Sequence, residues 1–535
     1  ISKELVKYKA IFKKKAQAET QPKKKNDTAG QADDLPITRL HKELADNLVE
    51  LKTITGNSAD IIVRELEIPL EKPVGAAVIM TEGLVNDQIV TETVIETLLQ
   101  IGSQKIDQPK LLEAIEKQIL AVTSTKRIDN WNSLFTSLLS GETIIFIDGF
   151  NQALASSTTG GDSRPVMEPQ TEVTIRGPRE SFNELLSTNT ALIRRRIKNP
   201  HLWLEKLSLG KVNQTDIGIM YIKGIANDKI VEEVKRRLKK VDIDAIIESG
   251  SIEQLIEDET FSFFPTVYHS ERPDVVAANL LEGRVAILIN GSPFVLTVPA
   301  LFIEFFQAAD DYYMRFDISF AIRILRSLIF LISMIAPATY VAITTYHQEM
   351  IPTLLIIAIA AQREAVPFPA FFEAFIMEIT FEILREAGVR LPRSIGQAVS
   401  IVGALVIGQA AVEAGIVSPA MVIVVSITAI ASFATPSFSM AIAARLIRFI
   451  LMLLAAIMGM YGIIVGLMII TLHLCSLRSF GIPYMAPLAP LMFRNIGDTF
   501  VRVPIWAMDI RPKLISQKNI SRAGDGQKPS PPPWK

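Results

Sequence analysis

The chain has 535 residues, which is long enough for about three domains. Its formal net charge of −1 gives no global field that would attract nucleic acid, and its single cysteine excludes an intrachain disulfide and argues against a cysteine-based metal site. The mean hydropathy of +0.30 averages two unlike halves, because a polar part precedes the long apolar stretches that begin after Arg326.

Residues 1–35 are rich in Lys, Gln and Ala and predict a basic, disordered tail. The lysines could touch anionic lipid headgroups, but a solvated tail is the simpler interpretation. Residues 36–155 predict a first mixed α/β subdomain. Apolar periodicity indicates strands at 61–68 and 74–80, helices at 86–101, 111–120 and 128–139, and strands at 143–147 and 152–155. The last two strands flank Asp148-Gly149 and predict a hairpin with a tight turn.

Residues 156–170 contain two adjacent glycines and two prolines, a composition typical of a linker. Residues 171–300 predict a second α/β subdomain, in which another hairpin is expected around Asn290-Gly291. Both subdomains are expected on the cytoplasmic side. Their boundary could hold a small ligand, or the pair could serve only as a structural vestibule and assembly platform.

Within the second subdomain, a strand at 216–222, a helix capped by Asn227 or Asp228, and a strand at 243–247 predict a βαβ unit with parallel strands. The basic run Arg194–Arg196 has two interpretations. It is either a solvated face with local ion pairs, which is the default, or a docking patch for a membrane or a neighbour.

Residues 301–477 predict an α-helical polytopic membrane domain with four to five helical segments. Three stretches lack Asp, Glu, Lys and Arg: 327–346, 414–444 and 449–477. Each is long enough to span a bilayer, because a ~30 Å hydrocarbon core needs roughly 20 apolar residues. The arginines cannot all be cytoplasmic if each stretch crosses once, so either a Pro-rich element is re-entrant or the last stretch, which contains Gly459, is broken. We expect the first arrangement, with four full spans and both chain ends inside.

The Pro-rich element consists of Pro367, Phe368 and Pro369. Its two prolines break a helix, and an interrupted backbone at membrane depth is tolerated only where protein or water covers it. The helix that follows carries Glu373, Glu378, Glu382, Arg385 and Glu386, and the first three of these glutamates are assigned to the same element. We expect it to lie at the membrane interface or, alternatively, to turn its charged face to a wet space.

The next span, at 396–417, has a stripe of small residues that would allow close helix packing, with Gln409 and Glu413 roughly opposite. A charge at the bilayer centre costs about 3 kcal/mol or more, so Glu413 should point into a bundle or a watery path. Val406, Gln409 and Glu413 are therefore candidates to line a pore. Alternatively, Glu413 lies near the end of the span and simply reaches interfacial water.

Residues 478–535 carry nine Lys or Arg against three Asp and predict a basic, Pro-rich C-terminal tail. Such segments tend to stay in the cytoplasm when they flank membrane spans. The chain has no Walker-type phosphate loop, its five histidines show no metal-ligand spacing, and no nucleophile–base signature is apparent. We therefore expect no enzyme, no cofactor and no bound metal.

Several strings of residues follow one another along the chain. The soluble half contains Glu172–Glu180, which includes Arg176, Gly177, Pro178, Arg179 and Glu180, and later Glu282–Pro299. The membrane half contains Arg363–Pro369, Leu391–Ser394 and Val412–Pro419. In this order, over roughly residues 50–510, they resemble the A subunits of the GerA family of spore germinant receptors, with both tails outside the match.

The resemblance implies a multi-pass protein of the spore inner membrane. It also implies two partners, a transporter-like B subunit that holds the germinant and a lipoprotein C subunit. A homo-oligomeric ring that conducts ions when nutrient binds is implied as well. The main hypothesis is therefore a germinant-gated channel subunit, and the alternative is a non-conducting scaffold that relays the signal. A secondary transporter would predict an internal repeat in the membrane half, which is not visible.

Overall fold

The computed structural model describes residues 39–101, 110–120, 124–160, 168–391, 403, 406–516, 519–524 and 527–529. The expected basic tail at 1–35, residues 161–167 of the expected linker and the start of the span expected at 396–417 lie outside these residues. The described part consists of two α/β subdomains, a helical bundle and a C-terminal segment.

The first subdomain is an antiparallel sheet between two helical layers. Its strands are β1 (Ile61–Ile68), β2 (Val74–Thr81), β3 (Thr125–Ile128), β4 (Thr143–Ile147) and β5 (Ala153–Ser156), in the spatial order β1-β2-β4-β5-β3. Its helices are α2 (Leu44–Thr55), α3 (Asp87–Ile89), α4 (Glu96–Ile101), α5 (Leu111–Leu120) and α6 (Trp131–Leu138), with a π-helical stretch Val90–Ile95 joining α3 to α4. The predicted strands and helices are confirmed to within a few residues.

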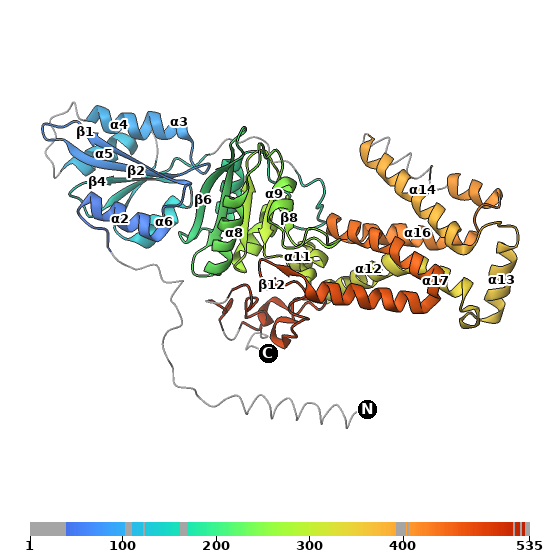
Figure 1. Ribbon diagram of the computed structural model, residues 1–535. Coiled ribbons are helices and arrows are strands. Elements are labelled where there is room, and N and C mark those ends of the chain that lie inside the picture. The colour runs from blue at the N-terminus through green and yellow to red at the C-terminus, as the bar shows by residue number, and fades with distance from the viewer. Residues whose placement is uncertain are drawn as a thin grey trace, which may run out of the picture. The chain divides into compact units, whose positions relative to one another are not determined.

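Successive side chains of β2 point to opposite faces of the sheet, and each face is covered by one helical layer. Val78 packs with the helices α4 and α5, whereas its neighbour Ile79 packs with α2 and α6 on the other face. Figure 1 shows α4 on one side of this sheet and α2 and α6 on the other. The expected hairpin is confirmed, with Thr143 opposite Ser156. Its connection spans residues 148–152 and is longer than the tight turn we expected.

The second subdomain repeats the first. Its strands are β6 (Leu202–Leu209), β7 (Thr215–Ile222), β8 (Tyr268–Ser270), β9 (Val285–Ile289) and β10 (Val295–Val298), in the order β6-β7-β9-β10-β8. Its helices are α7 (Leu186–Arg196), α8 (Asp228–Lys240), α9 (Ser249–Ile256) and α10 (Pro273–Leu281). Each helix occupies the same place between strands as its counterpart in the first subdomain.

The predicted βαβ unit is wrong. The strand β7 pairs antiparallel with β6 on one side and with β9 on the other, so no position beside it is open to a parallel strand. Residues 243–247 instead run along the turn between β6 and β7, where the carbonyls of Ile243 and Asp244 accept the N–H groups of Lys211 and Val212. Ile246 is buried there, which accounts for the apolar pattern that suggested a strand.

A buried ion pair joins the two subdomains. Arg194 is fully buried and donates to Asp60 from Nε at 2.7 Å and from Nη2 at 3.0 Å. Burial alone would raise the pKa of Asp60, but the Arg194 guanidinium outweighs it and holds the pKa below its ordinary value. Arg194 is thus neither a solvated charge nor a contact for another molecule, and both sequence interpretations are corrected at this position.

The helical half begins with a 3₁₀ turn (Phe302–Phe306) and α11 (Asp310–Tyr313). It continues with α12 (Phe316–Thr345), α13 (Thr353–Arg363), α14 (Ala370–Arg390), a helical stretch at 406–413, α16 (Pro419–Phe433) and α17 (Phe438–Ser476). Within the described residues, α12 and α17 are long and apolar enough to cross a membrane, and α13 and α16 are shorter apolar helices.

The helix α17 reverses direction at Gly459, where the backbone adopts the non-helical values φ 60° and ψ −142°. Gly462 lies against the Leu454 carbonyl, and Gly466 lies against the Leu451 side chain. In a straight helix these pairs would be about 12 Å and 22 Å apart along the axis. Residues 438–458 and 460–476 therefore form an antiparallel helical pair. The structure has the broken last stretch, which was the arrangement we did not favour.

With this reversal, six arginines of the bundle lie toward the same end. At the distal end, Tyr346 after α12 donates to the Ala456 carbonyl at 2.9 Å, and Glu373 in the first turn of α14 accepts the Ser418 N–H at 3.0 Å. The opposite, proximal end adjoins the second sheet, where Ser262 lies 2.9 Å from His473 in the last turn of α17. The helix directions put these arginines toward the proximal end: Arg323, Arg326, Arg385, Arg390, Arg445 and Arg448.

Residues 478–516, expected as part of a tail, pack against the folded protein. The strands β11 (Arg478–Ser479) and β12 (Ile482–Pro483) form a small hairpin. Tyr484 and Ile515 are fully buried, and Ile515 lies in the core of the second sheet. Apolar residues spaced among the basic ones make this packing possible, so this part of the expected tail is folded structure.

Candidate functional site

The three α14 glutamates assigned to the Pro-rich element, Glu373, Glu378 and Glu382, all face protein. Pro369 precedes the first helical residue, so the two prolines separate α13 from α14 as expected, and Pro367, Phe368 and Pro369 are exposed. Glu373 and Glu378 are fully buried. Glu373 lies 3.2 Å from Arg363 and caps α16 through the Ser418 N–H, an arrangement that ties α13, α14 and α16 together at the distal end.

Toward the proximal end, two more carboxylates of α14 meet arginines of α17. Glu378 Oε2 lies 2.5 Å from Arg448 Nη1, and Arg448 Nε donates to the Ser333 carbonyl of α12 at 2.8 Å. Glu382 Oε2 lies 2.8 Å from Arg445 Nη1. A charge inside an apolar bundle persists only when it is paired, so these contacts fix the register of α14 against α17.

Polar atoms remain without partners in this cluster. Among the described residues, Glu378 Oε1, Glu382 Oε1, Arg385 Nε and Arg448 Nη2 are buried and form no hydrogen bond. Arg385 donates to Ser432 and stacks over the Phe433 ring at 4.6 Å. Buried polar atoms of this kind normally bind water, so we expect these four atoms to be hydrated within the bundle.

The pore candidates lie on a face that the single chain leaves open. Val406 is 54% exposed, and Gln409 and Glu413 are exposed as well. Gln409 Nε2 donates to Glu413 Oε1 at 2.9 Å, one helical turn away. Gly408 is buried on the other side against Val422 of α16, so the small-residue side packs and the polar side faces outward. The structure thus does not bring this pair together with the carboxylates of α14.

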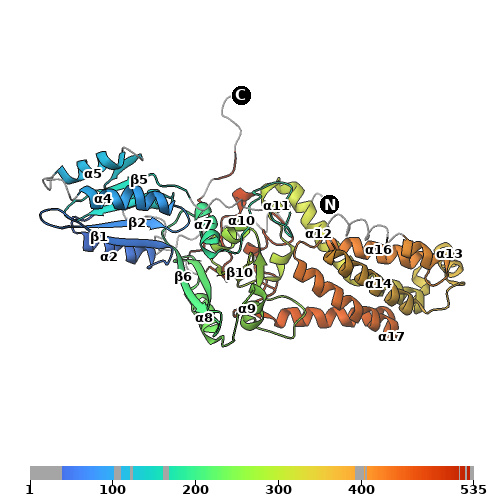
Figure 2. The ribbon, with the colours of Figure 1, turned by 90° about the horizontal axis from the view of Figure 1, so that it is seen from above.

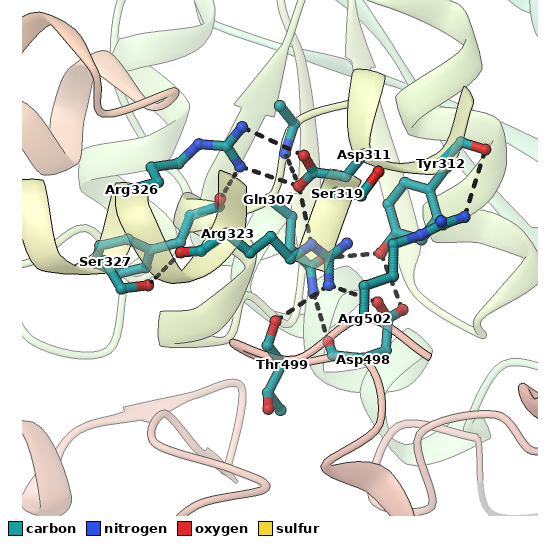
Figure 3. A network of polar contacts seen from close by, with 12 residues as sticks. Gln307, Asp311, Tyr312, Ser319, Arg323, Arg326, Ser327, Asp498, Thr499 and Arg502 are labelled. Atoms are coloured by element: carbon teal, nitrogen blue, oxygen red, sulfur yellow. Dashed lines mark hydrogen bonds and ion pairs between the residues drawn. The ribbon is translucent and has the colours of Figure 1, made fainter. Parts of the chain in front are cut away.

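A second polar network lies where the chain enters the bundle (Figure 3). Arg323 Nε donates to Asp311 at 2.9 Å, and its Nη1 donates to Asp498 at 2.8 Å. Arg326 binds the same Asp311 at 3.0 Å. Tyr312 donates to Asp498 at 2.9 Å, and burial followed by the Asp498 charge raises the pKa of Tyr312. The network joins α11, α12 and the C-terminal segment.

The motif residues form a strap, residues 171–180, that crosses the second subdomain toward α11. Its inward side chains are held there: Ser270 donates to Glu172 at 2.5 Å, and Arg272 donates to Thr174 at 3.1 Å and to the Pro178 carbonyl at 2.9 Å. Gly177 has φ 138° and lies against the Tyr313 ring, where a β-carbon would clash. Both the positive φ and the close contact with Tyr313 therefore require glycine at position 177.

Two strap carboxylates have different environments. Burial raises the pKa of Glu172 to about 7, and the neighbouring Glu271 carboxylate adds to the effect. Glu180 is partly exposed and accepts from Arg196 at 2.7 Å. Arg176 and Arg179 are exposed, so the motif presents its basic side chains outward.

Sequence reasoning missed the partners of the α14 carboxylates and the Arg323 network. Arg448 is 70 residues from Glu378, and Asp498 is 175 residues from Arg323. The one available signal was that arginines in and beside apolar stretches require acidic partners elsewhere in the chain. Among the described residues, no group of His, Cys, Asp or Glu has the geometry of a metal site.

These features define a class of protein: a membrane-associated helical bundle with paired internal charges, joined to two α/β subdomains. The sequence model of a family described as Bacillus/Clostridium GerA spore germination protein matches residues 49–514. The chain therefore belongs to the GerA spore germination protein family, and the resemblance drawn from its motifs is confirmed.

Named relatives support this assignment. The chain is 57% identical over 488 residues to spore germination protein KA of Bacillus subtilis (strain 168), covering 91% of this chain and 89% of that protein. It is 37% identical to spore germination protein GerLA of Bacillus cereus, covering 90% of this chain and 98% of that protein. A crystal structure of the N-terminal domain of the A subunit of the Bacillus megaterium spore germinant receptor GerK3 matches 50% of this chain and 99% of that domain, with 43% identity and a TM-score of 0.41.

Proposed function

We propose that this chain is the A subunit of a nutrient germinant receptor in the spore inner membrane. In this proposal it works with a transporter-like B subunit and a lipoprotein C subunit, and several copies form an ion-conducting channel that opens on germinant sensing. Membership in the GerA family and the names of the relatives support the receptor role. The proposal includes no catalytic step, no cofactor and no nucleic acid.

The proposed topology places the proximal end of the bundle in the cytoplasm. Six arginines of α12, α14 and α17 lie toward that end, whereas Arg363 lies at the distal end beside Glu373. Positive residues favour the cytoplasmic side of a membrane. Both α/β subdomains and the C-terminal segment then share that side. With one crossing for each apolar stretch, the arginines could not all be cytoplasmic. Because α17 crosses twice in the proposed topology, these six arginines can all lie on the cytoplasmic side.

The observation that supports conduction most directly is the exposed Gln409–Glu413 pair. Other carboxylates of the bundle, at Glu373, Glu378 and Glu382, have arginine partners. Among the described residues, Glu413 bonds only to the neutral Gln409, and it remains exposed in a region of apolar helices. A charge does not remain in hydrocarbon, so this face should border water. Copies arranged around a shared axis would enclose such a hydrated passage, with Val406 on its wall.

A non-conducting relay scaffold is the second candidate. The Arg323 network favours it, because buried ion pairs there connect α11 and the C-terminal segment to α12, the first helix of the bundle. Such a connection would transmit a movement of the soluble part to the bundle, whether or not this chain conducts ions.

Ion flux separates the two candidates. The purified chain in liposomes should release monovalent cations, and Glu413→Gln should lower that flux about fivefold, the effect of ~1 kcal/mol of lost attraction at the dielectric constant of water. A bulky Val406→Trp should block it. The matched control is Glu364→Gln, which neutralises an exposed carboxylate after α13 and should leave flux unchanged. Absence of flux from the wild-type chain, together with normal ion release from spores that carry Glu413→Gln and Val406→Trp, would favour the scaffold.

A further inference from the structure

The outer face of the strap carries exposed apolar and basic side chains. Val173 is 78% exposed and Ile175 is 85% exposed, because alternation along the extended strap turns them away from the anchored side chains. Within the described part of the chain, Arg179 forms an ion pair only with the equally exposed Glu168, at 3.4 Å, and Arg176 forms none. Apolar side chains at such exposure, bordered by charge, mark an interaction surface.

A second surface of opposite charge follows α9. It is the acidic loop, residues 257–263, in which Phe261 is 93% exposed and Phe263 is 50% exposed. Glu257 and Glu259 belong to the same loop, and neither forms an ion pair with a described residue. Burial and two neighbouring glutamates raise the pKa of Glu257, which is consistent with a site that lacks a cation.

The two surfaces lie at the same level of the molecule. The strap is fastened just before α12, where Asp310 accepts the Arg176 N–H at 3.3 Å. The acidic loop is fastened to the last turn of α17 through Ser262 and His473 at 2.9 Å. Both of these helix ends adjoin the 3₁₀ turn at 302–306, since Arg326 donates to the Phe306 carbonyl and Leu477 packs in the same core.

The two surfaces also lie on different flanks. Figure 2 shows α11, which holds the strap, and α9, which leads into the acidic loop, on opposite sides of the second subdomain. A rotation axis perpendicular to a membrane moves each surface sideways without changing its level. It therefore brings a surface on one flank against the opposite flank of the next copy.

We propose that the strap of one copy docks on the acidic loop of the next copy. Val173 and Ile175 pack on the two phenylalanine rings, and the arginines of the strap pair with Glu257 and Glu259. The contact is head-to-tail, so each copy offers both halves and the chain of contacts can close into a ring. This inference rests on the proposed homo-oligomer.

A lipid surface fits the acidic loop less well than a second copy does. Cytoplasmic leaflets carry negative potential, and the carboxylates around Phe261 would be repelled from them. The same carboxylates complement the exposed arginines of the strap. Charge complementarity of this kind determines which surfaces meet and in what register.

Cysteine cross-linking in the full-length chain tests the contact. In a Cys475→Ser background, Ile175→Cys combined with Phe261→Cys should give a ladder of covalent multimers with a short bifunctional maleimide. Each single variant should give none. A mixture of the two single variants, differently tagged, should stop at a heterodimer. The matched control pairs Phe261→Cys with Val212→Cys, a 79% exposed site between β6 and β7, and should give no ladder.

Charge reversal adds a second readout. Arg176→Glu with Arg179→Glu should lower the cross-linking yield severalfold, and adding Glu257→Arg with Glu259→Arg should restore it. An intact multimer by light scattering without the 175–261 ladder would overturn this contact and leave the oligomer standing. A chain that is always a monomer would overturn both. Homodimers from either single variant, or quenching of a dye at position 261 by brominated lipid, would also refute the proposed contact.

Discussion

Removing one partner of the buried Glu378–Arg448 pair should destabilise the bundle strongly. The two side chains are 0% and 1% exposed and lie 2.5 Å apart. Replacing Glu378 with Met leaves the Arg448 charge buried without its carboxylate, and loss of one partner of such a pair costs about 3–5 kcal/mol. Arg448→Met should have a similar effect, because it leaves the Glu378 carboxylate unpaired.

The double variant should recover most of the loss. Two methionines of similar length fill the space and leave no charge to desolvate, so the double variant should lie within about 2 kcal/mol of the wild type or above it. The coupling energy from the cycle should therefore be about 4 kcal/mol or more in magnitude, because the two single losses sum to about 6 kcal/mol or more. A matched control exists on the same helix: Glu386 and Arg390 lie 2.7 Å apart but are 65% and 78% exposed. Glu386→Met should cost about 0.5 kcal/mol or less.

The measurement is reversible unfolding of the detergent-solubilised full-length chain, with a midpoint and slope for each of the four members of the cycle. The reasoning is refuted if Glu378→Met and Glu386→Met shift the free energy of unfolding equally. It is refuted as well if the double variant is as unstable as the sum of the single variants, because the two charges would then not depend on each other.

Three further predictions concern the soluble part and the helical reversal. Asp60→Asn should loosen the subdomain contact by about 3 kcal/mol. In the wild type, the contribution of the Asp60–Arg194 pair should persist above the ordinary pKa of 3.8 and be lost as pH falls through the lower folded pKa of Asp60. The fluorescence of Trp203 should follow this change, because its indole N–H donates to the Ile54 carbonyl across the contact at 3.1 Å. The pKa of Glu172 is raised to about 7, so its contribution to stability should be complete below pH 4.5 and be lost as pH rises through 7. Hydrogen exchange of the strap at pH 6 and pH 8 should show this loss in the wild type but not in Glu172→Gln. Gly459→Ala should lower the unfolding midpoint, because the backbone there has positive φ and a β-carbon would meet the neighbouring imidazole ring; an unchanged midpoint would contradict the reversal.

Local patterns in the sequence located the strands and helices well, but not how they pair. The apolar run at 74–81 and the helical period in 111–120 are set by residues close in sequence. The order of strands in a sheet depends on segments that are far apart in the sequence. For that reason the apolar run at 243–247 was predicted to be a strand in a parallel pair, which the structure does not contain. The reversal at Gly459 was the arrangement that the sequence did not favour, and several glycines in the same apolar stretch offered the same backbone freedom.

One sequence signal would have predicted more of the soluble fold. The runs Glu82–Val90 and Lys223–Val231 share a glycine, an Asn-Asp pair and an Ile-Val pair at the same spacing. In the structure Gly83 and Gly224 both have positive φ, and Asn86 and Asn227 both cap the following helix. An internal repeat detected at this point would have predicted the same strand order for both subdomains, since repeated sequence folds into repeated topology.

The distribution of buried charge restricts where a gating motion can occur. The network around Arg323 and the contact between Ser262 and His473 hold the second subdomain to the start of α12 and the end of α17. These elements should therefore move as one body. The helices α14 and α16 are held to that body through few polar contacts, among them the pair of Glu378 with Arg448, and residues 406–413 pack on α16 through small side chains. A displacement of one copy by its neighbour at the strap would thus reach the first and last helices directly. The open face with Gln409 and Glu413 would respond only through α14 and α16, so the Glu378–Arg448 pair is where soluble movement and the proposed passage would be coupled.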